Sequence, residues 1–153
     1  MIRPIVEFGD VLYYSCTLST GQQIENIQRQ SAIICCGAYR HTSYSNLLTE
    51  LGWEPLHKRR FTHKLILFYK IIHNIYPKYL YNLLNFRQLS NYNLRQTSTL
   101  QPRFTRFMIT HNSFFPSTTI EWLKLPTSTQ NALSVASFKS LLRPRIFKNK
   151  YIK

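Results

Sequence analysis

Apolar side chains return every three or four positions along most of this chain, which is the spacing of one helix face. The pattern gives way only once to a long polar stretch, in residues 85–113. We therefore predict a mainly α protein, a small helical bundle with a long irregular or short β-hairpin insertion at about 85–113. The expected helices cover residues 3–16, 19–37, 43–52, 55–75, 77–84, 117–124 and 134–142.

Several helix ends carry recognisable signals. Ser19 with Gln22 three residues later matches a capping box, in which each side chain satisfies a backbone N–H of the first turn. Gly37 and Gly52 follow apolar stretches and suit the left-handed conformation that ends a helix. Pro55 fits the first turn of the longest helix, because a proline lacks only an N–H that would be unpaired there.

The spacing also predicts which faces are buried. For the helix over 19–37 the expected apolar stripe is Ile24, Ile27, Ala32, Ile34 and Cys35. For the helix over 55–75 it is Phe61, Leu65, Phe68, Ile72 and Ile75. Arg59, His63, Lys70 and Asn74, with Arg60 beside them, should then lie on the opposite, solvated face.

The polar stretch contains four arginines, no lysine and no acidic residue. Short strand-like pieces at 92–95 and 104–109 suggest a hairpin. The chain shows no internal repeat, so we expect one compact unit in three parts: a helical region over 1–84, an arginine-rich loop or hairpin over 85–113, and C-terminal helices with a basic tail over 114–153.

The charge is unevenly distributed. Residues 1–54 contain three lysines and arginines against five carboxylates, whereas residues 55–153 contain seventeen against one, Glu121. A generic solvated surface mixes both signs, so this asymmetry favours a polyanionic partner for the C-terminal two-thirds of the chain.

Several classes of catalytic site are not supported by the sequence. The four glycines lie far apart, so neither a P-loop nor a dinucleotide fingerprint is present. Asp10 is the only aspartate, while a two-metal site needs several converging carboxylates. No Gly-x-Ser-x-Gly elbow exists for a serine nucleophile. We expect no catalytic residues and no cofactor.

The cysteines and the hydropathy bear on disulfides, metal binding and membrane association. Cys16, Cys35 and Cys36 are odd in number, and we interpret them as buried reduced thiols. A zinc site from Cys35, Cys36 and His41 would lack the usual spacer between the cysteines. No apolar run approaches the ~20 residues of a membrane span, and no signal peptide is recognisable. We expect an intracellular protein, nuclear or cytoplasmic.

The first candidate interface is the start of the longest helix, where Lys58, Arg59, Arg60 and Lys64 cluster. Exposed cations at this end oppose the helix dipole at a cost of roughly 0.3–1 kcal/mol each. The placement makes sense if phosphates approach that end. The alternative is that early carboxylates neutralise the cluster, namely Glu7, Asp10, Glu25 and Glu50.

Two further basic groups are candidates for phosphate contacts. Arg95, Arg103 and Arg106 alternate with aromatic rings in the polar stretch, at Tyr92, Phe104 and Phe107. Guanidinium groups bind phosphate bidentately and exposed rings stack on bases, which suits single strands or hybrid duplexes. The last group is Lys139, Arg143 and Arg145, near the C-terminus.

A set of short motifs recurs in order over residues 2–147. They are RPIVEFGD (3–10), IENIQRQSA (24–32), TSYSNLLTELGWEPL (42–56), LFYKIIH (67–73), NYNLR (91–95), NSFFPST (112–118) and SFK (137–139). In order and spacing they resemble the thumb and C-terminal region of LINE-type (non-LTR) retrotransposon reverse transcriptases. The family commonly has an arginine where this chain has Ile33, which weakens the case for a basic contact from that helix.

The resemblance implies a thumb-like role for residues 1–84, without the catalytic palm of the parent RNA-directed DNA polymerase. We therefore expect a non-catalytic fragment that binds RNA or an RNA–DNA hybrid through phosphates, with the missing palm domain as a possible partner. The alternatives are a structural or interaction module of a larger enzyme and the functionless product of a decayed element. A membrane-surface protein ranks last, since no segment pairs an apolar face with a lysine-rich one throughout.

Overall fold

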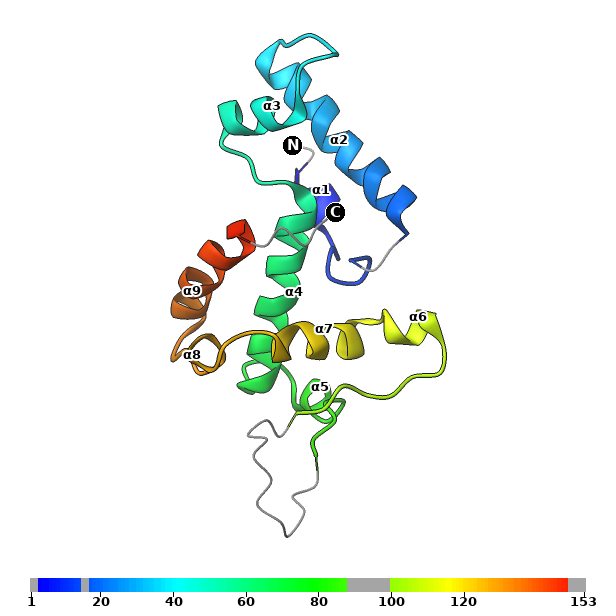
Figure 1. Cartoon of the computed structure of the whole chain (residues 1–153), viewed down its shortest axis with the longest axis vertical. Helices are drawn as coiled ribbons and strands as arrows, with labels where there is room; N and C mark the ends of the chain where they lie inside the picture. The colour runs from blue at the N-terminus through cyan, green and yellow to red at the C-terminus, as the bar shows by residue number, and fades with distance from the viewer. Residues whose placement is uncertain (1–2, 15–16, 88–99, 149–153) are drawn as a thin grey trace. The chain divides into compact units, whose positions relative to one another are not determined.

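The computed structural model describes residues 3–14, 17–87 and 100–148, without the side chains of Arg3 and of residues 144–148. Over these ranges the protein is mainly helical, as the sequence predicted (Figure 1). The helices are α1 (Arg3–Glu7), α2 (Leu18–Cys36), α3 (Tyr44–Leu51), α4 (Leu56–Ile72), α5 (Lys78–Tyr81), α6 (Met108–His111), α7 (Phe114–Leu123), α8 (Thr127–Gln130) and α9 (Val135–Lys148).

The chain divides into two compact units, residues 1–63 (unit 1) and residues 64–153 (unit 2). The division falls inside α4, which begins in unit 1 and ends in unit 2. It therefore differs from the sequence-based division at residues 84 and 113 within a single unit. None of the helices in the described ranges is both long and apolar enough to cross a membrane.

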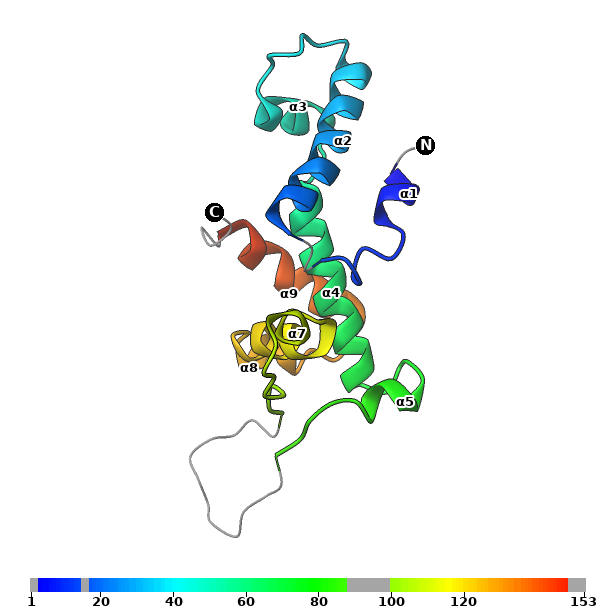
Figure 2. The same ribbon diagram turned by 90° about the vertical axis from the view of Figure 1, so that its right-hand side faces the viewer.

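In unit 1, α2 packs against α3, and the two helices lie side by side in both views (Figures 1 and 2). Both helices end where the sequence predicted, at Gly37 and Gly52, each with a φ near +60° that suits glycine. The N-cap of α2 lies two residues earlier than predicted. Thr17, not Ser19, accepts the capping hydrogen bond, from the backbone N–H of Thr20 at 3.3 Å.

Two helix predictions in unit 1 are wrong. The helix expected over 3–16 ends at Glu7, because Gly9 adopts a left-handed φ of 68° and the chain turns there. The apolar stripe expected on α2 is largely exposed, with Ile34 77% accessible. The buried positions are Gln28 and Ala32, so α2 buries a partly polar face.

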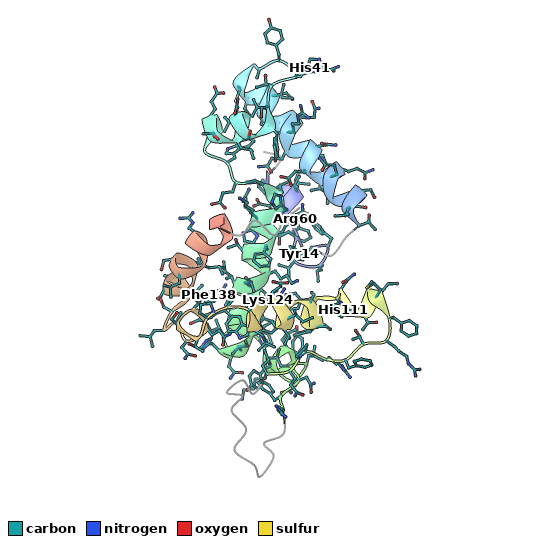
Figure 3. The ribbon with its side chains drawn as sticks, viewed as in Figure 1. Tyr14, His41, Arg60, His111, Lys124 and Phe138 are labelled. Atoms are coloured by element: carbon teal, nitrogen blue, oxygen red, sulfur yellow. The ribbon has the colours of Figure 1, made fainter. Side chains whose placement is uncertain are left out.

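The core of unit 2 is aromatic. The Phe138 ring stacks on Tyr69 and Trp122, with centroids 4.6 and 5.7 Å apart, and Phe68 packs against Trp122 at 5.5 Å. Phe138, labelled in Figure 3, comes from α9, which contacts α8. The Tyr69 hydroxyl donates a 2.6 Å hydrogen bond to the carbonyl of Ala132. These contacts join the second half of α4 to α7, α8 and α9.

Several helices of unit 2 have other bounds than predicted: α5 ends at Tyr81 instead of residue 84, and α7 begins at Phe114 instead of residue 117. Helix α4 stops at Ile72 rather than at residue 75, because Asn74 takes a positive φ of 55°, and Ile75 is left 57% exposed. Helix α9 continues to Lys148, so the first part of the expected basic tail is helical.

The polar insertion is irregular where it is described. Phe86 and Leu100 form an isolated antiparallel bridge. The strand expected at 104–109 is wrong, since α6 begins at Met108 and the residues before it form no ladder. The strand expected at 92–95 lies outside the described residues.

Candidate nucleic-acid interface

The basic cluster at the start of α4 is built into the interior of unit 1. Arg59 and Arg60 are only 9% and 4% exposed, although the sequence placed them on a solvated face. Arg59 forms an ion pair with Glu7. The Arg60 guanidinium lies 3.7 Å from a carboxylate oxygen of Glu25 and 6.0 Å from the centre of the Tyr13 ring.

Three early carboxylates therefore meet side chains of α4. Besides the two arginine pairs, Asp10 is 5% exposed and lies 2.5 Å from the Nδ1 atom of His63. The Tyr14 ring packs on Phe61, with centroids 6.0 Å apart, and Figure 3 labels Tyr14 and Arg60 in this region. These contacts match the alternative that the sequence left open, in which the N-terminal acids neutralise the cluster.

Glu25 is the centre of this polar core. One of its oxygens accepts hydrogen bonds from the Tyr44 hydroxyl at 2.8 Å and from the backbone N–H of Leu56 at 3.1 Å. Burial by itself would raise the pKa of Glu25, but the interactions with His57, Tyr44 and Leu56 together lower it. The carboxylate thus stays ionised and ties α2 to the start of α4.

This polar core had only a faint signal in the amino-acid sequence. Glu25 and Gln28 are three residues apart on a helix and so share a face. The Gln28 amide donates to the Glu54 carbonyl at 3.0 Å, and Tyr44 bridges to Gln28 at 3.1 Å. Neither partner was identifiable from spacing, because both lie in other elements of unit 1.

Lys64 belongs to unit 2, where it is 1% exposed and donates a 2.9 Å hydrogen bond to the Ser117 hydroxyl. Burial lowers the pKa of Lys64 to about 8, against which the charge of Glu121 acts. Lys58 is half-buried. A phosphate-binding role for Arg59, Arg60 and Lys64 is thus opposed by their burial, and we leave them out of the interface.

The arginines of the polar stretch have a different environment. Arg103 and Arg106 are exposed, and the rings between them and beyond them, Phe104 and Phe107, are 92% and 72% exposed. Met108 and Ile109, which begin α6, are also exposed. The segment over 103–109 (the arginine–aromatic segment) therefore presents cations and flat rings together on the surface of unit 2. Arg95 lies outside the described residues.

The third basic group lies elsewhere in unit 2. Lys139 and Arg143 are exposed on α9, while the side chain of Arg145 lies outside the described part of the chain. Helices α6 and α9 lie toward opposite ends of α7 (Figure 1). The structure thus separates this group from the arginine–aromatic segment within the same unit.

Carboxylates are scarce in unit 2. Its only acidic side chain, Glu121, forms an ion pair with Lys124 at 2.9 Å. Within the described residues, Arg103, Arg106, Lys139 and Arg143 have no carboxylate within ion-pair distance. Their charges thus remain available to a phosphate chain.

The cysteines do not form a metal site in the described ranges, where no cluster of three His, Cys, Asp or Glu side chains occurs. The expectation of buried thiols is wrong for Cys35, which is exposed. Burial and then the neighbouring Glu50 raise the pKa of Cys36, which favours its neutral thiol form. Cys16 lies outside the described residues.

Comparisons of the chain with protein-family models, with curated proteins and with solved structures give no match. The reverse-transcriptase likeness therefore rests on the ordered motifs alone and stays a prediction.

Proposed function

We propose that unit 2 binds RNA or an RNA–DNA hybrid through phosphate contacts and base stacking, without catalysing a reaction. The observation that carries this proposal is the arginine–aromatic segment, in which exposed arginines alternate with exposed phenylalanine rings and form no ion pair with a carboxylate of the described residues. Base–aromatic stacking contributes about 1–3 kcal/mol per base. The resemblance to the thumb and C-terminal region of LINE-type reverse transcriptases points to the same class of ligand.

Burial and exposure favour a smaller set of phosphate contacts than the sequence suggested. Arg103 and Arg106 are the primary phosphate ligands in this proposal, with Phe104 and Phe107 as stacking partners. Lys139 and Arg143 add a second, separate contact on α9. Two of the three basic groups named from the sequence thus retain exposed members, and the group at the start of α4 does not contribute.

The salt dependence of binding tests this proposal. With about 4–6 phosphates contacted, log K against log salt should fall with a slope of roughly −3 to −4 for a 20-nucleotide RNA strand. Fluorescence anisotropy with the full chain from 50 to 300 mM salt measures the slope. A slope near zero, or no binding at the lowest salt, contradicts the proposal.

A pair of charge-matched variants locates the interface. R103Q/R106Q should make the slope shallower by about 1–2, because each lost phosphate contact removes roughly 0.7–0.9. R29Q/R40Q removes the same charge from unit 1 and should leave the slope unchanged. Equal slopes for the two variants would mean that only net charge matters and that the arginine–aromatic segment is not the interface.

A structural module of a larger protein is the second candidate function. The observation in its favour is the exposure of apolar side chains in residues 3–14, where Ile5, Phe8 and Leu12 are 76–86% accessible. Large exposed apolar patches commonly mark protein interfaces. Under this candidate R103Q/R106Q would leave oligonucleotide affinity as low as that of the unaltered chain.

A further inference from the structure

A cavity of about 130 Å³ lies within unit 2, beside the arginine–aromatic segment. Its wall is partly apolar and partly polar. The side chains that matter for its chemistry come from the residues after α5, from the chain just before that segment and at its start, from the turn between α6 and α7, and from α7: Asn85, Gln101, Arg103, Ser113, Phe115 and Thr119.

Backbone pairing places the side-chain amides of Asn85 and Gln101 next to each other at the wall of the cavity. The Phe86–Leu100 bridge and the hydrogen bond from the Gln101 N–H to the Asn85 carbonyl, at 2.8 Å, hold the two chain segments together. The side-chain amides of Asn85 and Gln101 take part in no hydrogen bond with a described residue. Each therefore offers both a donor and an acceptor.

The hydroxyl groups on the other wall offer acceptors. The Ser113 hydroxyl donates to the Thr110 carbonyl at 2.6 Å, and the Thr119 hydroxyl donates to the Phe115 carbonyl at 2.8 Å. Because these protons are engaged, the oxygen lone pairs are what the two side chains present. The Phe115 ring supplies a flat apolar surface, and among the described residues of the wall Arg103 supplies the positive charge.

The volume of the cavity and the polar groups in its wall together indicate a class of ligand. Pockets for drug-sized molecules and whole cofactors measure about 300–1,000 Å³, whereas a single water needs only about 10–15 Å³. A cavity of about 130 Å³ lies between these and suits one ring system. A planar ring with donors and acceptors along its edge, linked to an anion that Arg103 can reach, is the description of a nucleotide.

We propose that this cavity holds one unpaired base of a bound strand, with the phosphate of that nucleotide on Arg103. The inference rests on the proposed nucleic-acid binding and adds a preference to it. A base inside a duplex cannot enter the cavity, because it is stacked and paired, whereas a bulged base is already available. The chain should therefore prefer nucleic acids that contain an unpaired base over perfect duplexes of equal charge.

Three 16-base-pair RNA duplexes test the preference with the full chain: one perfectly paired, one with a single bulged nucleotide, and one with an abasic residue in the bulge. The bulged duplex should bind about tenfold more tightly than the paired one, in line with roughly 1–3 kcal/mol per stacked base. The abasic bulge should lose this gain, although its charge and bending are nearly the same.

Variants then assign the preference to the cavity. N85A/Q101A should abolish the difference between the bulged and the abasic duplex while leaving the affinity for the paired duplex within about twofold. N82A/N131A removes two exposed amides outside the cavity and serves as the matched control. Circular dichroism of each variant checks its fold, and the comparison of the three duplexes on the unaltered chain needs no variant.

The outcomes separate the two proposals. Equal affinity for the three duplexes overturns the cavity proposal and leaves the nucleic-acid binding intact. Absence of binding to every duplex and strand at low salt overturns both. Displacement of the bulged duplex by an equal concentration of nucleoside monophosphate would show that the site takes free nucleotides, which also overturns the proposal of a strand-borne base.

Discussion

Unit 1 contains six lysines and arginines and five carboxylates, whereas unit 2 contains fourteen lysines and arginines and one carboxylate. The buried side chains of the two units also differ in polarity. Unit 1 buries charged and polar side chains, among them Asp10, Gln28, Arg59 and Arg60. Unit 2 buries a cluster of aromatic rings around Phe138, and most of its described lysine and arginine side chains are exposed.

This difference shows that a cluster of basic residues in a sequence does not by itself indicate an anion-binding surface. Cations close to carboxylates within one unit become structural, because a buried charge has to be paired. In unit 2, which has almost no acid, Lys64 is buried, but most of the other described cations stay in solvent, where an external anion can reach them. The same residue types thus hold unit 1 together and form the candidate interface of unit 2.

The largest expected effect tests the aromatic core of unit 2. F138A should destabilise this unit by about 3–5 kcal/mol, since it removes a fully buried ring that contacts Tyr69 and Trp122. Urea unfolding followed by tryptophan fluorescence measures the change. L133A truncates a fully exposed side chain and should stay within about 0.5 kcal/mol. Similar values for the two variants would contradict the assignment of the core.

The next effect tests the polar core of unit 1. E25Q should destabilise this unit by about 2–4 kcal/mol, because it removes the negative charge that faces the buried Arg60 guanidinium and weakens the two hydrogen bonds that the charged oxygen accepts. Urea unfolding followed by circular dichroism reports it, with E50Q, at an exposed position, as the control. A control variant as unstable as E25Q would show that general charge balance, not this contact, stabilises unit 1.

The pH dependence of the E25Q effect follows from the lowered pKa of Glu25. The pKa of Glu25 in the folded protein is below its usual 4.5. The stability that the carboxylate contributes is therefore present above pH 4.5 and is lost as the pH falls through the lower folded value. The stability difference between the unaltered chain and E25Q should shrink over that acidic range.

Lys64 gives a dependence of the same sign in unit 2, but at alkaline instead of acidic pH. Because its folded pKa is about 8 and its usual value is 10.5, the unfolded chain binds more protons between these values. The free energy of unfolding should rise with pH from about 8 to 9.5, towards a limit of at most about 3 kcal/mol. In K64M this rise should disappear. Urea titrations at three pH values measure it, and a persistent rise in K64M would assign it to other groups.

The smallest expected effect concerns binding rather than stability. R59Q should change oligonucleotide affinity by less than about twofold, because Arg59 is paired with Glu7 and only 9% exposed. R106Q removes the same charge at an exposed position and should weaken binding severalfold. Comparable losses in both variants would mean that the cations of unit 1 reach the ligand after all.

Local signals in the sequence predicted much of the fold. The ends of α2 and α3 followed from Gly37 and Gly52, because a left-handed residue ends a helix whatever surrounds it. The helical character of residues 55–75 followed from periodicity, within three residues of the observed end. The helix over 3–16 failed because Gly9 used its conformational freedom for a turn, an option that periodicity does not reveal.

The candidate site was predictable only in part. The exposure of Arg103 and Phe104 agrees with the reading of the polar stretch as a surface segment. The cavity beside it had no sequence signal, since Asn85 and Gln101 are ordinary amides that a backbone hydrogen bond brings together. Pairing across fifteen intervening residues is decided by tertiary contacts, which no local pattern encodes.

The amino-acid sequence by itself determined the helical class, the positions of the glycine caps and the supply of charge in each part of the chain. Only the tertiary structure decided which cations are used internally. Arg59 and Arg60 meet Glu7 and Glu25 although more than thirty residues separate each pair along the chain. The physical reason is that helical periodicity shows which residues share a face, whereas burial and charge pairing depend on which other element covers that face.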